Sequence, residues 1–423
     1  MILYQRGSEN DFISEKELNE IIVATLDKLG KRKKVIAIPP DITRFHSKAG
    51  EITCIVHKYY GNTLTDVLPA IGTHFPMTKE EIKRMFPSVP LNLFREHDWR
   101  NGTTCLGRVP SDFVRKVSDR MVEFDWPADV DKLLINGNFD LILSIGQVVP
   151  HEVIGMANGN KNIFVGTGGA EGINKSHFVG AVYGMERIMG RSDTPVRKIL
   201  DYASEHFAKN LPIVYVQTVI GKNEKGSLVI RGIFIGDDNE CFKKAAELSL
   251  KVNFTMLNEP LKKVVVYLDP SEFKSTWLGN KSIYRTRMAT ADGGELIVLA
   301  PGLREFGEDK TIDRLIRKYG YVGTKKVMEL VDKNDDLKNN LSAAAHLIHG
   351  SSEGRFKVTY CPGKISREEI EKVNFHYGNL NEYSMKYDIS KLKDGFNEVN
   401  GEKIFYISNP AIGLWAYRGR FSQ

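Results

Sequence analysis

Apolar and polar positions alternate along the first 250 residues in a way that predicts helices interleaved with strands. Residues 15–30 space their apolar side chains helically and end on a glycine, which predicts an amphipathic helix with a C-terminal cap. Three apolar runs, KKVIAIPPD, TDVLPAIGTH and NFDLILSIGQVVPH, predict buried strands that end in polar residues. Further helical patterns occupy 78–87, 111–121 and 196–210. The alternation predicts an α/β domain with a largely parallel sheet.

The pattern starts again near residue 255. Expected strands are LKKVVVYLD, GGELIVLAPG and GRFKVTYCPG, and expected helices are TIDRLIRKYG and TKKVMELVDK. We therefore expect two α/β domains with mainly parallel sheets, 1–255 and 256–403, and an active site in the cleft between them. The tail, 404–423, is expected to return to the first domain.

Composition changes this picture little. The chain has 423 residues, of which 42% are hydrophobic and 26% charged, as in ordinary globular proteins. No apolar run reaches the length of a membrane span, and MILYQRGSENDF lacks the layout of a secretory signal, so we expect a cytoplasmic protein without a membrane partner. Four scattered cysteines predict reduced thiols rather than disulfides.

The net charge of +6 is modest, and basic residues alternate with acidic ones. The cluster GKRKK at 30–34 lies between an expected helix and an expected strand, which favours a solvated helix end over a nucleic-acid site. We expect no nucleic-acid partner. A mildly basic surface suits an enzyme that handles anionic metabolites.

Chemistry-bearing side chains follow three of the expected strands. Asp41 and Arg44 follow the first, His74 the second and His151 the third. Ligand groups gather beyond the carboxyl ends of parallel strands. Arg44 could hold a carboxylate through two hydrogen bonds, with Asp41 orienting it or contacting a ligand hydroxyl. A local ion pair or turn cap explains the same two residues equally well.

The segment PHEVIGMANGNKNIFVGTGGAEGINKSH, residues 150–177, has almost no apolar periodicity and carries His151, Lys161 and His177. Lys161 lies between a glycine and an expected strand, NIFV, and is either an exposed loop lysine or a covalent anchor or anion contact. His97, in REHDW, has an acidic neighbour that could orient it.

The remaining histidines have simpler explanations. His346 and His349 are spaced i, i+3 but have no third ligand nearby in sequence, which favours the end of an apolar helix over a metal pair. Isolated histidines are most often structural, and this applies to His46, His57, His206 and His376.

Glycines 166, 168 and 169 follow the expected strand NIFV and precede a possible helix. Backbone N–H groups there could cradle a phosphate. The segment does not fit the dinucleotide fingerprint, because Glu171 falls where the next glycine is required, and no Walker lysine follows.

Taken together, these segments resemble the nickel-pincer lactate racemase family. DITR resembles its Asp-x-x-Arg turn, GTHFPMTKEE its Gly-Thr-His segment, EHDW its His-Asp dipeptide, and PHEVIGMANGNK with INKSH its Pro-His, Gly-Lys and His stretch. The anchors span residues 38–177, and the length and two-domain layout fit the whole chain.

The resemblance implies a racemase or epimerase of a 2-hydroxy acid. The family's cofactor is a nickel-pincer nucleotide, a pyridinium-3-thioamide-5-thiocarboxylate mononucleotide that holds nickel. By resemblance, Lys161 is the tether and His177 the nickel ligand, while His97 and His151 are the acid–base pair. Arg44 binds substrate, and Asp41, His74, Gly166, Gly168 and Gly169 lie with the cofactor. The enzymes that make the cofactor are implied as transient partners.

Two departures from the family's pattern change the expected substrate. Lactate-type members carry Gly-Gly before the tether lysine, where this chain has Gly159-Asn160. In SIYRTRMA, Arg285 replaces a glutamine and Met288 a lysine thought to contact substrate. These changes indicate a substrate other than lactate, a sugar acid or another polar hydroxy acid, with Arg285 or Arg287 in contact with it. One of these arginines could instead form an interdomain ion pair.

Two other functions remain open from the sequence. One is a metal-dependent hydrolase or lyase with His151, His177 and a carboxylate as ligands. The other is a non-catalytic protein that binds hydroxy acids. Retention of three histidines and the lysine together argues against the binding protein.

Overall fold

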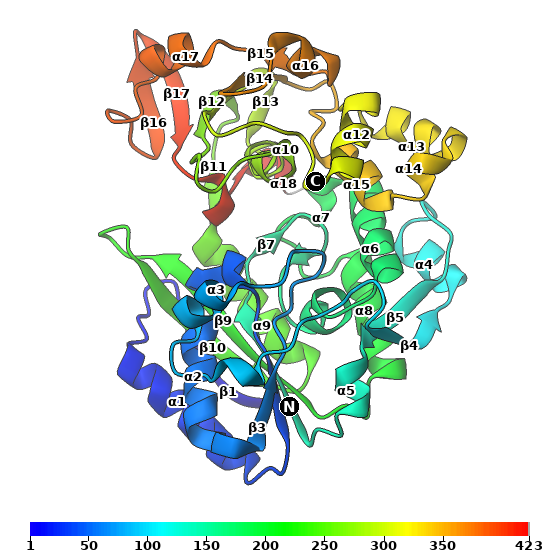
Figure 1. The fold of residues 1–423 in the computed structure, drawn as a ribbon. Coiled ribbons are helices and arrows are strands. Elements are labelled where there is room, and N and C mark those ends of the chain that lie inside the picture. Colours follow the sequence, from blue (N-terminus) through cyan, green and yellow to red (C-terminus); the bar gives the residue numbers. More distant parts are fainter. Residues whose placement is uncertain (422–423) are drawn as a thin grey trace. The chain divides into compact units, whose positions relative to one another are not determined.

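The computed structural model describes residues 1–421, which form two compact units. Residues 1–179 and 189–253 make the first unit, and residues 180–188 join the chain from Phe254 onward in the second. Figure 1 labels the helices and strands. Within the described residues, no helix combines the length and apolar character needed to cross a membrane.

The first unit contains ten strands and most of the N-terminal helices. The strands are β1 (Ile2–Gly7), β2 (Val35–Ile38), β3 (Leu64–Val67), β4 (Thr103–Val109), β5 (Trp126–Asp131), β6 (Leu141–Gln147), β7 (Pro150–His151), β8 (Gly155–Met156), β9 (Ile213–Lys222) and β10 (Leu228–Gly236). The helices are α1 (Glu15–Leu29), α2 (Ala49–Tyr60), α3 (Lys79–Met85), α4 (Ser111–Val117), α5 (Lys132–Asn136), α6 (Ala170–Tyr183), α8 (Pro195–Phe207) and α9 (Asn239–Asn253), with short 3-10 turns η1 (Ile42–Ser47), η2 (Gly61–Thr63) and η3 (Leu91–Leu93) and the π-helix η4 (Asn162–Gly166).

The central sheet of this unit has the order β1-β10-β9-β6-β2-β3. The pairs β3–β2, β2–β6 and β6–β9 are parallel, whereas β9–β10 and β10–β1 are antiparallel. The carboxyl ends of β2, β3 and β6 therefore reach the same edge of the sheet. The mainly parallel sheet predicted from the sequence is confirmed.

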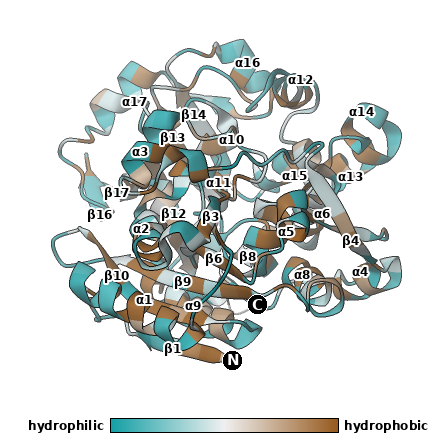
Figure 2. Cartoon of the chain, turned by 60° about the horizontal axis from the view of Figure 1, so that its bottom comes forward, coloured by the Kyte–Doolittle hydropathy of each residue, from teal (hydrophilic) through white to brown (hydrophobic). Residues whose placement is uncertain are grey.

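Helices cover both faces of this sheet. Leu18, Ile22 and Leu26 of α1 join a core with Val35 of β2 and Leu143 of β6. On the opposite face, α9 packs its apolar residues against β9 and β10 in a second core. Helix α1 begins at a capping box, in which Ser14 and Glu17 exchange side-chain and backbone hydrogen bonds, and ends at Gly30. Figure 2 shows hydrophobic and hydrophilic residues alternating around α1, as burial of one face requires.

The second unit contains a six-stranded sheet and a two-stranded one. Its strands are β11 (Phe254–Leu257), β12 (Leu261–Tyr267), β13 (Thr290–Ala300), β14 (Lys357–Pro362), β15 (His376–Tyr377), β16 (Gly395–Val399), β17 (Glu402–Ile407) and β18 (Leu414–Tyr417). Its helices are α7 (Met185–Ile188), α10 (Thr276–Gly279), α11 (Lys281–Tyr284), α12 (Lys310–Tyr319), α13 (Thr324–Lys333), α14 (Asp335–Lys338), α15 (Leu341–His349), α16 (Arg367–Lys372), α17 (Leu380–Lys386) and α18 (Arg418–Phe421), with a 3-10 turn η5 (Pro410–Ile412).

The larger sheet has the order β15-β14-β13-β12-β17-β16, and only the β16–β17 pair is antiparallel. The tail differs from the expectation that 404–423 returns to the first domain. Strand β17 lies beside β12, and β18 pairs in parallel with β11, so the tail belongs to the second unit. The apolar residues of β17 and β18 are buried because these strands complete the sheets of the second unit.

One expected strand is wrong. NIFV, residues 162–165, forms the π-helix η4 and not a strand. Its four residues are all buried, as they would be in a strand. A short apolar run has no periodicity by which a buried helical turn can be told from a buried strand.

Candidate active site

The loops that follow β2 and β3 meet through a carboxylate–imidazole pair. Asp41 and Thr43 lie in the turn after β2, and His74 lies after β3. His74 Nδ1 is 2.7 Å from Asp41 Oδ2, and the backbone N–H and hydroxyl of Thr43 donate to Asp41 Oδ1. Burial alone would raise the pKa of Asp41, but the hydrogen bonds from His74 and Thr43 outweigh it and lower that pKa. The charged carboxylate therefore holds Nδ1–H, which leaves the ring's lone pair on Nε2.

Arg44 is not oriented by Asp41 as the sequence suggested. Its backbone N–H donates to the Asp41 carbonyl, but the Asp41 carboxylate is occupied by His74 and Thr43. Among residues 1–421, no carboxylate forms an ion pair with the partly buried Arg44 side chain. A guanidinium that no carboxylate neutralises is suited to bind an anionic ligand.

Lys161 follows a sharp turn and precedes the π-helix. Asn158 and Gly159 both have positive φ, 69° and 64°, and reverse the chain just before it. Burial, together with the positive charges of Arg44 and Arg197, lowers the pKa of Lys161 to about 8. Near pH 8, about half of Lys161 is therefore a neutral, nucleophilic amine.

His177 presents one ring nitrogen with a lone pair. Its Nδ1 lies 2.8 Å from the carbonyl oxygen of Ile173, one turn earlier in α6, so Nδ1 carries the proton. Burial lowers the pKa of His177 and keeps the imidazole neutral, and the nearby charge of Lys161 acts in the same direction. A neutral imidazole whose other nitrogen is fixed by a carbonyl is the form that ligates a metal ion.

His151 lies in the short hairpin of β7 and β8, directly beyond β6, and is 8% exposed. Its Nδ1 accepts the backbone N–H of Val153 at 3.2 Å. That hydrogen bond places the proton of a neutral ring on Nε2. The acidic side chain next to it, Glu152, was missed in the sequence. Its charge acts on both Lys161 and His177, and its position beside His151 was the only signal for it.

Both ring nitrogens of His97 lie close to hydrogen-bond acceptors. Its side chain is 0% exposed, with Nδ1 2.7 Å from Asp131 Oδ2 and Nε2 3.0 Å from the carbonyl oxygen of Gly168. Both neighbours are acceptors, so both ring nitrogens are committed to structural hydrogen bonds. The acidic neighbour in the sequence, Asp98, instead accepts backbone N–H groups of residues 100 and 101.

The glycine-rich turn is explained by close packing. A Cβ on Gly168 would lie 1.9 Å from the carbonyl oxygen of Phe164, and one on Gly166 would lie 2.7 Å from the Ala70 side chain. A Cβ on Gly169 would lie 2.5 Å from a carboxylate oxygen of Asp129. A carboxylate at this point opposes binding of a phosphate, and the geometry gives no support to the expected cradle.

The two arginines of the second unit have different surroundings. Arg287 is almost fully buried, and its Nε donates to Glu186 at 2.8 Å, with Nη1 3.4 Å from the His349 carbonyl. This ion pair lies within the second unit. Arg285 is 2% exposed, and its backbone carbonyl accepts the N–H of Trp415.

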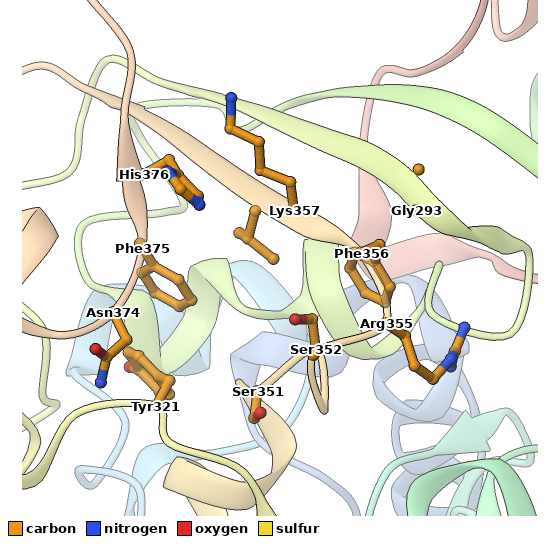
Figure 3. A pocket seen from close by; sticks show the side chains of 13 residues that line it. Gly293, Tyr321, Ser351, Ser352, Arg355, Phe356, Lys357, Asn374, Phe375 and His376 are labelled. Atoms are coloured by element: carbon orange, nitrogen blue, oxygen red, sulfur yellow. The ribbon is translucent and has the colours of Figure 1, made fainter.

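A separate pocket of about 390 Å³ lies in the second unit (Figure 3). Tyr321 and Phe375 are stacked at one side of it, with ring centroids 4.4 Å apart. The guanidinium of Arg355 pairs with two carboxylates and the ammonium of Lys357 with one, so its basic groups are already neutralised. None of the described residues that line it was predicted as a site residue.

Among the described residues, no three His, Cys, Asp or Glu side chains are grouped so that they could hold a metal ion. A hydrolase with His151, His177 and a carboxylate as ligands requires such a group. His177 can serve as a single imidazole ligand to a metal ion whose other ligands come from an organic group.

Comparisons with known proteins agree on the N-terminal part of the chain. Residues 5–188 match the family model described as the lactate racemase N-terminal domain. A crystal structure of a protein from Thermotoga maritima is similar over 96% of this chain and 98% of its own, with a TM-score of 0.80 and 25% identity. The lactate racemase apoprotein from Thermoanaerobacterium thermosaccharolyticum covers 97% of this chain and 94% of its own, with a TM-score of 0.71 and 18% identity, and shows the same fold.

No curated protein sequence matches the chain significantly. The match of the family model includes Asp41, Arg44, His74, Lys161 and His177. It confirms the resemblance drawn from the motifs. Residues 5–188 match the lactate racemase N-terminal domain family, and the chain as a whole shares the fold of the lactate racemase apoprotein.

Proposed function

We propose that this protein is a racemase or epimerase that inverts C2 of a 2-hydroxy acid on a nickel-pincer nucleotide tethered to Lys161. The observation that carries the proposal is the pairing of an amine with a lowered pKa, Lys161, and a neutral imidazole, His177, in one electrostatic cluster. The family of the N-terminal domain supports the reaction class.

The residues present fit this cofactor. The neutral amine of Lys161 would form the thioamide, and Nε2 of His177 would ligate nickel. When bound, the nucleotide supplies the group that stores a hydride, which is the difficult part of the chemistry. No phosphate contact is assigned to Gly166, Gly168 or Gly169, because their packing is already close.

Inversion removes a hydride from C2 and a proton from the hydroxyl group, which gives a planar 2-keto acid, and then returns both with the hydride on the opposite face. The two enantiomers present the hydroxyl proton in different directions, so two bases are required. We assign one of them to His151, which acts as a base once its proton moves to Nδ1 and the hydrogen bond from the Val153 N–H is released. We assign the second to His74 rather than to His97, because Asp41 fixes the tautomer of His74 and both nitrogens of His97 are committed.

The substrate carboxylate would bind Arg44. The positive charge of its guanidinium favours an acid over a neutral alcohol. We propose a substrate that is more polar than lactate, a sugar acid or another polar hydroxy acid. Arg285 remains a candidate for its additional contact, and no substrate contact is assigned to Arg287.

The proposal can be tested by the intact mass of protein co-expressed with the enzymes that make the cofactor, its expected transient partners. Wild type should gain the mass of the nucleotide and bind about one nickel per chain. Lys161→Ala should lose the adduct, whereas Lys244→Ala, a change on the exposed face of α9, should keep it. Loaded protein should interconvert the enantiomers of at least one 2-hydroxy acid.

Two results would contradict the proposal in different ways. An unmodified mass together with bound zinc would support a hydrolase or lyase. A modified protein that turns over none of a panel of sugar acids and short hydroxy acids would support a binding protein.

A further inference from the structure

The turn that carries Lys161 is held from behind by a buried side-chain network. Gly159 packs so closely that an added Cβ would lie 3.1 Å from the Phe242 ring and 3.4 Å from Nη1 of Arg197. Asn158 is 3% exposed and occupies the left-handed region of the backbone. Both residues lie within three positions before Lys161, so the contacts that hold this turn also fix the position of the lysine backbone.

Arg197, near the start of α8, makes most of these contacts. It is 2% exposed, and its guanidinium stacks on Phe242 at 3.9 Å from the ring centroid. Nη2 donates to the carbonyl oxygens of Met156 at 2.8 Å and Asn158 at 3.2 Å, and Nη1 donates to the side-chain oxygen of Asn160. One buried cation thus binds three oxygen atoms on the segment that ends at Lys161.

Asn160 joins this cation to a carboxylate. Its oxygen accepts from Arg197, and its Nδ2 donates to Asp201 Oδ1 at 2.7 Å and lies 3.1 Å from Ser204 Oγ. Asp201 Oδ2 also accepts from Asn239 at the start of α9. Arg197 and Asp201 are one turn apart on α8, and the amide of Asn160 lies between them. Its oxygen accepts from Arg197 and its nitrogen donates to Asp201.

We propose that Asn160 and Arg197 form a clamp that positions Lys161. An amide is required because one planar group must accept from a guanidinium and donate to a carboxylate. Glycine would leave both partners buried without this contact, and aspartate would face Asp201 with a like charge. The consequence for tethering rests on the proposed function, whereas the clamp itself does not.

The first experiment uses Asn160→Gly, with protein made without the cofactor enzymes. Amides 158–166 should exchange with deuterium about ten-fold faster, the effect of losing a buried hydrogen bond. The pH at which acetic anhydride modifies Lys161 at half its maximal rate should rise from about 8 toward the value of exposed lysines, because the amine gains water. Asn253→Gly, which removes a hydrogen bond to Ser249 at the end of α9, should change neither result.

The second experiment is a rescue that a general loss of stability cannot produce. Asn160→Asp should speed exchange of amides 158–166 at least as much as Asn160→Gly. Asn160→Asp keeps an acceptor facing Arg197, and adding Asp201→Asn supplies a donor facing the new carboxylate, so exchange should return to within about three-fold of wild type.

The clamp is overturned if Asn160→Gly leaves both exchange and the Lys161 profile unchanged, or if the second substitution brings no recovery. These readouts need neither cofactor nor activity. An intact clamp in a protein that never gains the nucleotide would therefore contradict only the proposed function.

Discussion

At the scale of single residues, the site places its groups at a cost to stability. At pH 8 Lys161 is charged in the unfolded chain, whereas in the folded chain its lowered pKa of about 8 leaves about half of it neutral. The same burial that makes the amine reactive removes the hydration of its charged form. A function that needs a neutral lysine therefore predicts a measurable stability penalty at that position.

Replacing Lys161 by methionine should stabilise the protein. Between the folded pKa of about 8 and the ordinary value of 10.5, the unfolded chain binds a proton that the folded chain does not, so wild-type stability rises with pH across this window. At pH 7 the substitution should gain about 2–3 kcal/mol in the free energy of unfolding. Urea titrations from pH 7 to 10.5 should show the rise in wild type and its loss in Lys161→Met.

Asp41 should matter for turnover far more than Asp131, although each pairs with a histidine. Asp41→Asn removes the group that fixes the His74 tautomer, and kcat of the loaded enzyme should fall about 10²- to 10⁴-fold. Asp131→Asn removes the carboxylate partner of His97, while its amide oxygen can still cap α5, so it should lower the melting temperature while kcat changes less. A larger loss of kcat in Asp131→Asn would restore His97 as the second base.

Residues at strand ends could be predicted from the sequence because each follows an apolar run. Asp41, His74 and His151 lie beyond β2, β3 and β6, whose carboxyl ends share one edge of the sheet. The hydrogen bond between His97 and Asp131 could not be predicted, because the two residues are 34 positions apart in the sequence. The ion pair of Arg287 could not be predicted either, since Glu186 lies 101 residues earlier.

At the scale of elements, helices with a clear period and a cap were predictable. Helix α1 has both, and the structure confirms it at Glu15–Leu29. The π-helix was not predictable, because its residues are apolar throughout and its shape depends on packing around the turn. Asn162 donates to the carbonyl oxygen of Ile145, which ties this element to β6.

The glycine-rich turn after the π-helix should respond to substitution as a packing element. Gly168→Ala places a methyl group 1.9 Å from a backbone oxygen, which cannot move without distorting the π-helix, and should cost about 3 kcal/mol in unfolding free energy. Gly172→Ala, where the nearest atom is at 3.0 Å, is the matched control and should cost clearly less. Denaturant titrations decide, and an equal effect of both changes would point to backbone freedom rather than packing.

At the scale of the whole molecule, two units could be predicted, but not which segments build each of them. Residues 180–188 belong with the second unit although they continue the helix that carries His177. No change in hydrophobic pattern along the sequence marks residues 180–188 as part of the second unit. The ion pairs of Glu186 supply the physical reason, because they bind this segment to Arg287 and Arg355 of the same unit.

Glu186 should therefore be a stability determinant of the second unit. Its pKa is lowered despite burial, because the charges of Arg287 and Arg355 outweigh desolvation. Glu186→Gln leaves the buried Arg287 without its counter-ion and should cost about 2–4 kcal/mol in unfolding free energy. Asp292→Asn is the control, because Asp292 pairs with the same Arg355 but is 70% exposed, and should cost less than about 1 kcal/mol. Equal costs would show that the ion pairs act through surface charge and that burial of Arg287 is not what binds residues 180–188 to this unit.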